Sequence, residues 1–120
     1  MGRMERVNQQ MKREISLILQ KDISDPRLMF VTITGVTVSP DLHVARVRFS
    51  TLGGDKQLLA VQESLDRASG FIRRLIGERI RLRLTPKIEF VYDDSIAYSD
   101  RIERTIQEIH DANSKSPQDN

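Results

Sequence analysis

The apolar pattern between residues 56 and 79 constrains the fold most, because it predicts two helices that meet at a break. Apolar residues recur at helical spacing on both sides of Ser69-Gly70. Glycine in a helix interior costs about 1 kcal/mol relative to alanine, and Gly/Ser pairs favour sharp bends. We expect one helix from about Lys56 to Ala68, a kink made by Ala68, Ser69 and Gly70, and a second helix from Phe71 to about Arg79.

The N-terminal part of the chain predicts a helix followed by a strand. Apolar residues at helical spacing run from Arg3 to Lys21, and the helix should end before Pro26, because proline disfavours helical geometry in the residue before it. Apolar and hydroxyl residues then alternate from Phe30 to Val38. The apolar phase shifts after Gly35, and a β-bulge at Gly35 would absorb this shift.

Two further strands and a short C-terminal helix complete the expected order. Apolar and polar residues alternate from His43 to Ser50, with Arg46 and Arg48 facing outward. The turn before this segment joins the first two strands as an antiparallel hairpin. Lys87 to Tyr92 predicts the third strand. A helix start at Asp93-Asp94-Ser95 leads into a final helix marked by Ile102, Ile106 and Ile109.

The composition limits the class of protein. With 120 residues and 38% hydrophobic content, we expect one α+β domain over residues 1–110 and a disordered polar tail over 111–120. No cysteine is present, which excludes disulfides and thiolate chemistry. No apolar run approaches the roughly 20 residues that span a bilayer, and the N-terminus lacks the apolar segment of a signal peptide. We expect a cytoplasmic protein.

Charge is sorted along the chain. Leu65 to Lys87 carries seven basic and two acidic side chains, a net +5, whereas Ile88 onward has three basic and eight acidic ones, a net −5; the whole chain is +2. Such a distribution directs one face of a protein toward a polyanion. The candidate RNA-binding residues are Arg67, Arg73, Arg74, Arg79, Arg81 and Arg83, with Arg6 and Arg13 in a second patch on the first helix.

Several of these arginines also have structural interpretations. Arg74 and Glu78 are four residues apart and can pair across one helical turn. The arginines from Arg79 to Arg83 lie where a helix C-terminus favours cations. A helix that starts after Gly70 would also offer unpaired backbone N–H groups to an anion. The sequence leaves phosphate binding and structural pairing open.

Base stacking is not expected to dominate nucleic-acid binding. Tryptophan is absent from the chain. Stacking on single-stranded RNA needs exposed aromatic faces. The residues expected to be mostly core-facing are Phe30, Phe49, Phe71, Phe90 and Tyr92.

The sequence offers no catalytic or metal-binding set. His43 and His110 lack ligand spacing around them. Helix capping explains Asp93-Asp94, and Gly53-Gly54 is not followed by the Lys-Ser/Thr of a phosphate-binding loop. We expect a protein that is not an enzyme and that uses no metal or cofactor.

The expected order of elements resembles a type II K-homology (KH) module, αββααβ, of the kind that clamps a nucleic-acid backbone. The Gly-x-x-Gly loop of such modules is absent, and Ala68-Ser69-Gly70 stands at the helix junction. We therefore expect a KH-like domain with a helix-kink-helix in place of that loop.

A second resemblance rests on short motifs in a fixed order. They are Arg6-Val7, Asp25-Pro26-Arg27-Leu28, Val31-Thr32-Ile33-Thr34-Gly35-Val36, Ser39-Pro40-Asp41-Leu42 with Ala45, Ala68-Ser69-Gly70-Phe71-Ile72-Arg73, and Leu82-Arg83 through Pro86, Phe90 and Asp93. In these motifs the chain resembles the bacterial ribosome-binding factor A family over nearly all of residues 6 to 93. It departs from the family pattern at Lys87-Ile88, where an acidic residue and leucine are more usual.

This resemblance implies a cold-shock-associated, non-enzymatic factor that binds free or immature small ribosomal subunits. It also implies contacts with small-subunit rRNA near the decoding region, a role in late rRNA maturation and processing, and release by an assembly GTPase. We expect a monomer with no membrane partner. The alternatives are a generic KH-like RNA-binding module, a protein adaptor that uses the same arginine face, and an amphipathic helix on a membrane surface.

Overall fold

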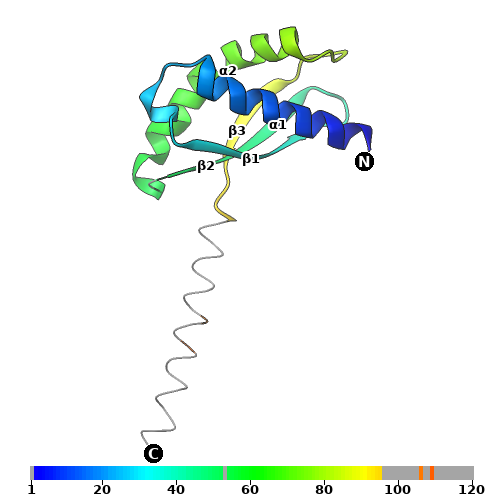
Figure 1. Ribbon diagram of the computed structural model, residues 1–120. Helices are drawn as coiled ribbons and strands as arrows, with labels where there is room; N and C mark the ends of the chain where they lie inside the picture. The colour runs from blue at the N-terminus through cyan, green and yellow to red at the C-terminus, as the bar shows by residue number, and fades with distance from the viewer. Residues whose placement is uncertain (1, 53, 96–105, 107–108, 110–120) are drawn as a thin grey trace, which may run out of the picture.

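The structure is a computed structural model in which residues 2–52, 54–95, 106 and 109 are described. Figure 1 shows the helices on one side of a three-stranded sheet, so the protein is a small two-layer α+β domain. Its elements are α1 (Arg3–Lys21), η1 (Pro26–Leu28), β1 (Val31–Val38), β2 (Val44–Thr51), η2 (Gly54–Gln57), α2 (Leu58–Arg79) and β3 (Lys87–Tyr92), where η marks a 3-10 helix.

The sheet has the strand order β1-β2-β3. β1 and β2 pair antiparallel, which confirms the predicted hairpin, and β3 pairs parallel to β2. The register shifts between Ile33 and Gly35, so that Thr34 is the extra residue of a bulge. The predicted bulge is therefore present, with its extra residue directly before Gly35.

One hydrophobic core fills the space between the sheet and the helices. Phe49 of β2 is fully buried and makes edge contacts with Phe90 and Tyr92 of β3, at ring-centroid distances of 6.4 and 5.8 Å. Met11 of α1 and Ile72 of α2 are also fully buried. Burial of each large apolar side chain stabilises the fold by roughly 1.5–3 kcal/mol. The core thus fixes both helices on the same face of the sheet.

The predicted break within α2 is wrong. Residues 58 to 79 form one α-helix that continues through Ser69 and Gly70. Its buried apolar residues stay on one helical stripe on both sides of the glycine, and their burial outweighs the cost of about 1 kcal/mol for a helical glycine. These residues are Val61, Leu65, Ile72 and Ile76.

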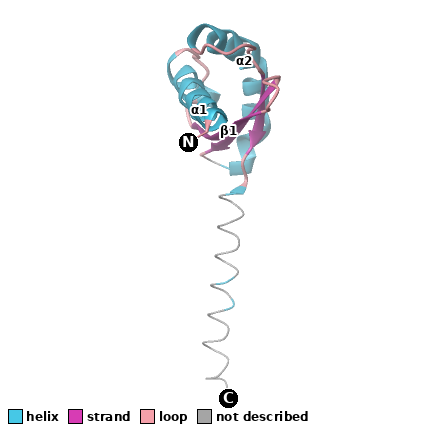
Figure 2. Cartoon of the chain, turned by 90° about the vertical axis from the view of Figure 1, so that its right-hand side faces the viewer, coloured by secondary structure: helices cyan, strands magenta, loops and turns pink. Residues whose placement is uncertain are grey.

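Although α2 is continuous, it bends along its length, as Figures 1 and 2 show. The Ser69 hydroxyl donates a hydrogen bond to the Asp66 carbonyl oxygen at 2.7 Å, and Ser69 with Gly70 forms a Gly/Ser pair, which is a common site of helix bends. The N–H groups of residues 71–73 lie inside the helix, so the predicted anion site at a new helix start does not form. In the described part of the chain the order of helices and strands is αββαβ, not αββααβ.

The C-terminal predictions fall mostly outside the described residues. Asp93 accepts a hydrogen bond from the backbone N–H of Ser95 at 2.9 Å, which agrees with a helix start at this position. Ile106 and Ile109 are largely exposed. Ile102 and the tail 111–120 lie outside the described residues. Within the described part of the chain, no helix is both long and apolar enough to cross a membrane.

Candidate nucleic-acid interface

The eight arginines predicted to bind RNA lie on α1, on α2 and on the segment that joins α2 to β3. All eight are exposed, but their guanidinium groups have different partners. The structure therefore separates them into arginines that hold the fold together and arginines that can bind a phosphate.

Arg73 bonds to the segment that follows α2. Its Nε and Nη2 atoms donate to the Thr85 carbonyl oxygen at 3.2 and 3.0 Å. The same segment approaches α2 so closely that a β-carbon at Gly77 would lie 3.1 Å from the Thr85 hydroxyl oxygen. Arg73 and Gly77 thus hold the connection to β3 against the helix.

Arg79 joins the two helices. Its Nη2 atom lies 2.9 Å from Asp22 Oδ2, and its Nη1 atom lies 3.8 Å from Glu14 Oε2. Ion pairs at this level of exposure contribute at most about 1 kcal/mol each. Arg79 therefore has a structural role that competes with phosphate binding.

Arg74 and Arg67 have most of their donors available. The Arg74 guanidinium lies 5.2 Å from the centroid of the Phe71 ring, a cation–π contact, and within the described residues it forms no ion pair with Glu78. Arg67 donates to the Ser64 hydroxyl at 3.4 Å, a long hydrogen bond. Both arginines can still donate to a phosphate.

Two aromatic residues do not face the core as expected. Phe30 lies before β1 and is 60% exposed, and Phe71 on α2 is 37% exposed. Phe49 and Phe90 are buried, as predicted. The partly exposed ring of Phe71 adjoins the Arg74 guanidinium, so this part of α2 presents a cation and an aromatic ring together.

The segment after α2 meets the N-terminus of α1. Arg83 and Arg3 line one pocket of about 240 Å³, together with Pro40 and Leu42 from the β1–β2 turn. Among the described residues, Arg81 has no hydrogen bond or ion pair. The fold therefore brings Arg83 of this segment close to Arg3 of α1, although the two are far apart in the sequence.

Arg6 and Arg13 occupy the exposed side of α1. They are seven residues apart, which places them about 10.5 Å apart along the helix and on the same side of it. Neither has an ion pair within the described part of the chain. This patch matches its prediction in exposure, and its role in binding stays a prediction.

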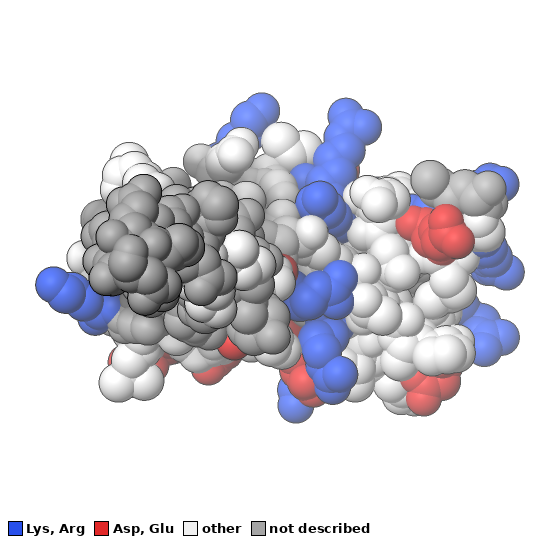
Figure 3. Space-filling model, turned by 90° about the horizontal axis from the view of Figure 1, so that it is seen from below, with Lys and Arg blue, Asp and Glu red and all other residues white. Residues whose placement is uncertain are grey.

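A third cationic surface was not included among the predicted RNA contacts. Arg46 and Arg48 of β2 and Lys87 of β3 lie on the face of the sheet opposite α1 and α2, which no helix of the described part of the chain covers. Figure 3, seen from this side, shows Lys and Arg side chains in a band across the molecule. Alternation in β2 predicted that Arg46 and Arg48 face outward, but it could not show that this face stays uncovered.

The acidic residues at the strand ends have structural partners. Hydrogen bonds from Ser95 and from the Thr34 hydroxyl, the latter at 2.6 Å, lower the pKa of Asp93 to about 2, and the charge of Arg48 adds to this effect. Hydrogen bonds from Ser39 and His43 lower the pKa of Asp41 below its usual range. The Asp93 carboxylate thus links β1 to the end of β3.

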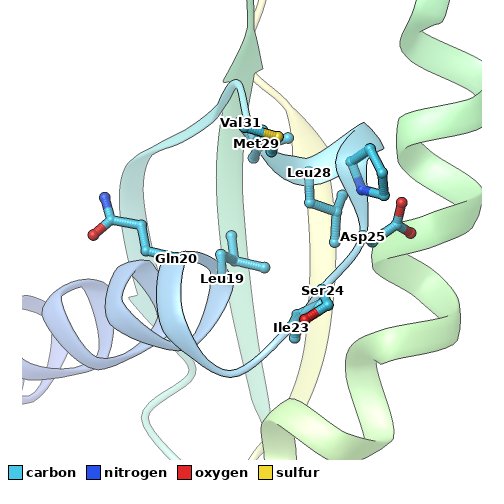
Figure 4. A pocket seen from close by; sticks show the side chains of 9 residues that line it. Leu19, Gln20, Ile23, Ser24, Asp25, Leu28, Met29 and Val31 are labelled. Carbon is cyan, nitrogen blue, oxygen red and sulfur yellow. The ribbon is translucent and has the colours of Figure 1, made fainter.

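A pocket of about 430 Å³ lies between the end of α1, η1 and the start of β1. Figure 4 shows that Leu19, Leu28 and Val31 line it from these three elements. Its one carboxylate, Asp25, accepts a hydrogen bond from the backbone N–H of Arg27 at 3.0 Å. Among the described residues, no group of three or more His, Cys, Asp or Glu side chains could hold a metal ion. The lining of this pocket indicates no catalytic chemistry.

The fold and the exposed arginines define a small α+β domain with cationic surfaces. The family model of ribosome-binding factor A matches residues 3–106. The chain is 44% identical over 108 residues to the ribosome-binding factor A of Staphylococcus carnosus, and the match covers 90% of this chain and 94% of that relative. The chain therefore belongs to the ribosome-binding factor A family.

Solved structures are similar as well. The crystal structure of ribosome-binding factor A from Thermus thermophilus matches with a TM-score of 0.68 and 26% identity, over 77% of this chain and 97% of that chain. A homology model of the T. thermophilus protein, fitted into a cryo-EM map of a 30S–RbfA complex, matches with a TM-score of 0.60 and 26% identity, over 72% of this chain and 91% of that chain.

Proposed function

We propose that this protein binds free or immature small ribosomal subunits and assists late maturation and processing of small-subunit rRNA, especially in the cold. It acts by binding and not as an enzyme, as a cytoplasmic monomer without a cofactor, and an assembly GTPase triggers its release. Membership of the ribosome-binding factor A family carries this proposal. The fitting of a Thermus relative into a map of a 30S complex supports the small subunit as the partner.

The exposed arginines supply a physical basis for this binding. A guanidinium group forms forked, charge-assisted hydrogen bonds to phosphate oxygens, and neutralised phosphates release counterions. The arginines best placed for this role have no acidic partner among the described residues: Arg6, Arg13, Arg67, Arg74, Arg81 and Arg83.

The proposed mode of RNA binding depends on Ala68-Ser69-Gly70, which stands where a KH module has its Gly-x-x-Gly loop. A KH-like domain without Gly-x-x-Gly lacks the usual clamp for splayed nucleotides. We propose that the bend of α2 near Ala68, Ser69 and Gly70 sets the direction of its second half. The arginines there then meet the backbone of folded RNA: Arg74 directly, and Arg73 with the donors that its bonds to the Thr85 carbonyl oxygen leave available.

Co-sedimentation with ribosomal particles tests the proposal. The protein is incubated with immature and mature small subunits, large subunits and assembled ribosomes at several salt concentrations. Enrichment on free small subunits that falls as salt rises is the expected result. Failure to bind any subunit at low salt would overturn the proposal, and binding to an acidic protein that survives nuclease treatment would favour the adaptor alternative.

A further inference from the structure

The uncovered face of the sheet has the features of a phosphate-binding surface. Arg46 and Arg48 point from β2 to the side opposite the helices, with Lys87 of β3 on the same side. Across the three strands, all of which are described, Glu89 is the one acidic residue. The face therefore has a net positive charge in a chain whose overall charge is only +2.

The Arg48 side chain lies over Gly35 of β1, where only a glycine leaves room for it. A β-carbon at Gly35 would lie 3.1 Å from Arg48 Cζ and 3.2 Å from Nε, and would overlap Nη2. Gly35 has no left-handed backbone conformation, so its lack of a side chain provides room for the guanidinium. Arg48 Nη1 also donates to Thr37 Oγ1 at 2.9 Å. These contacts fix one guanidinium on the sheet surface and leave further N–H donors available.

Arg46 lies beside this fixed group and is exposed. Its register partners are Thr37 on β1 and Glu89 on β3, yet among the described residues it forms no hydrogen bond or ion pair. Arg46, Arg48 and Thr37 line one hollow of about 240 Å³, with Ser39 and Val44. Two guanidinium groups and a hydroxyl that can still donate its proton therefore converge on one shallow site.

The acidic groups near this site form no ion pair with its arginines within the described residues. Glu89 lies on the same face without an ion pair to Arg46 within the described residues. Asp93 lies near Arg48, but its oxygens accept hydrogen bonds from Thr34 and Ser95. An anion that contacts Arg46 therefore need not displace a carboxylate.

We propose that Arg46 and Arg48, with the Thr37 hydroxyl, bind the phosphate backbone of folded RNA on the open face of the sheet. This proposal rests on the proposed function, because it adds a contact surface for the same partner. Side chains two residues apart on a strand are about 6.6 Å apart along it, so each guanidinium can contact a separate phosphate. Within the three strands, Val91 is the one exposed large apolar side chain on this face, so the strands offer little of the apolar core that a protein interface would need.

Affinity measurements on purified small subunits test the site. Arg46→Gln should weaken binding about fivefold to tenfold, and should reduce the slope of log affinity against log salt by about one unit. Gly35→Ala retains every charge but displaces the Arg48 guanidinium, and should also weaken binding. Arg27→Gln is the matched control, since Arg27 is exposed on η1 away from this face, and it should bind like the wild type.

Each outcome decides the question. The sheet-face site is overturned if Arg46→Gln and Arg46→Gln/Arg48→Gln both bind small subunits as tightly as the wild type does. That result leaves the proposed function standing. Equal losses in Arg27→Gln and Arg46→Gln overturn the sheet-face site as well, because they report a general effect of charge. Absence of wild-type binding overturns the proposed function itself. Thermal unfolding of each variant shows that a loss of binding is not a loss of folding.

Discussion

Arginines from one basic segment have different roles because different parts of the chain pack against them. Arg73 donates to a backbone carbonyl of the α2–β3 connection, and Arg79 pairs with carboxylates of α1 and of the residue that follows it. Arg81 has no such partner among the described residues. A guanidinium that already bonds within the protein has fewer N–H donors available for phosphate. It must break an existing contact before its bonded donors can reach one. We therefore expect RNA contacts to depend more on Arg81 than on Arg79.

Asp93 provides a prediction on pH dependence at the same scale. Its pKa is lowered in the folded protein to about 2 from an ordinary value of 3.8, so the folded state favours the ionised form. The resulting stability is fully present above about pH 4 and is lost as the pH falls toward 2. Asp93→Asn should be less stable than the wild type at pH 6, and urea unfolding from pH 6 to pH 2 should show this gap closing.

The neighbouring acid Asp94 supplies the control for this prediction. It is exposed, and it follows Asp93 directly in the chain. Asp94→Asn should leave both the stability at pH 6 and its decline with acid nearly unchanged. A gap between Asp93→Asn and the wild type that stays constant down to pH 2 would contradict the ionised carboxylate as the source of the stability.

At the scale of elements, the position of the helices and strands was predictable, but the continuity of α2 was not. α1 and β3 have the predicted bounds because periods of 3.6 and 2 are directly visible in the sequence. At Ser69-Gly70 the local cost of glycine suggested a break. The buried residues Leu65 and Ile72, seven positions apart, keep the same helical phase, and tertiary burial outweighed that cost.

The two glycines of α2 give a matched pair of substitutions. A β-carbon at Gly70 meets no atom within 4 Å, so Gly70→Ala should stabilise the protein by about 0.5–1 kcal/mol. A β-carbon at Gly77 lies 3.1 Å from Thr85 Oγ1, so Gly77→Ala should gain less or be destabilised. Urea unfolding midpoints measure both effects. Equal stabilisation by the two substitutions would contradict this account of the packing.

Binding of the same variants to small subunits tests the bend. If glycine at position 70 is needed for the direction of the second half of α2, Gly70→Ala should bind more weakly although it is more stable. Affinity equal to the wild type would show that the bend, or glycine's part in it, is not needed for binding.

At the scale of the whole molecule, cationic groups lie on two opposite sides. α1 covers one face of the sheet and presents Arg6 and Arg13 outward, while Arg46 and Arg48 lie on the other face. The sequence could not predict this arrangement, because alternation shows which side chains share a face and not which face the helices cover. The parallel pairing of β3 with β2 likewise depends on how α2 crosses the sheet.

Two opposite basic surfaces can act together or in turn, and the two cases differ in how substitutions combine. If RNA contacts both sides in one complex, the losses in log affinity from Arg6→Gln/Arg13→Gln and Arg46→Gln/Arg48→Gln should add in the fourfold variant. If the protein binds in two alternative orientations, each double variant still binds through the unchanged face. It then loses only the part of the affinity that its own face contributes, while the fourfold variant loses both parts. We expect additivity, because a folded RNA surface can enclose a small domain from more than one side. Small losses in both double variants, followed by a much larger loss in the fourfold variant, would contradict simultaneous contact and show that the two faces substitute for each other.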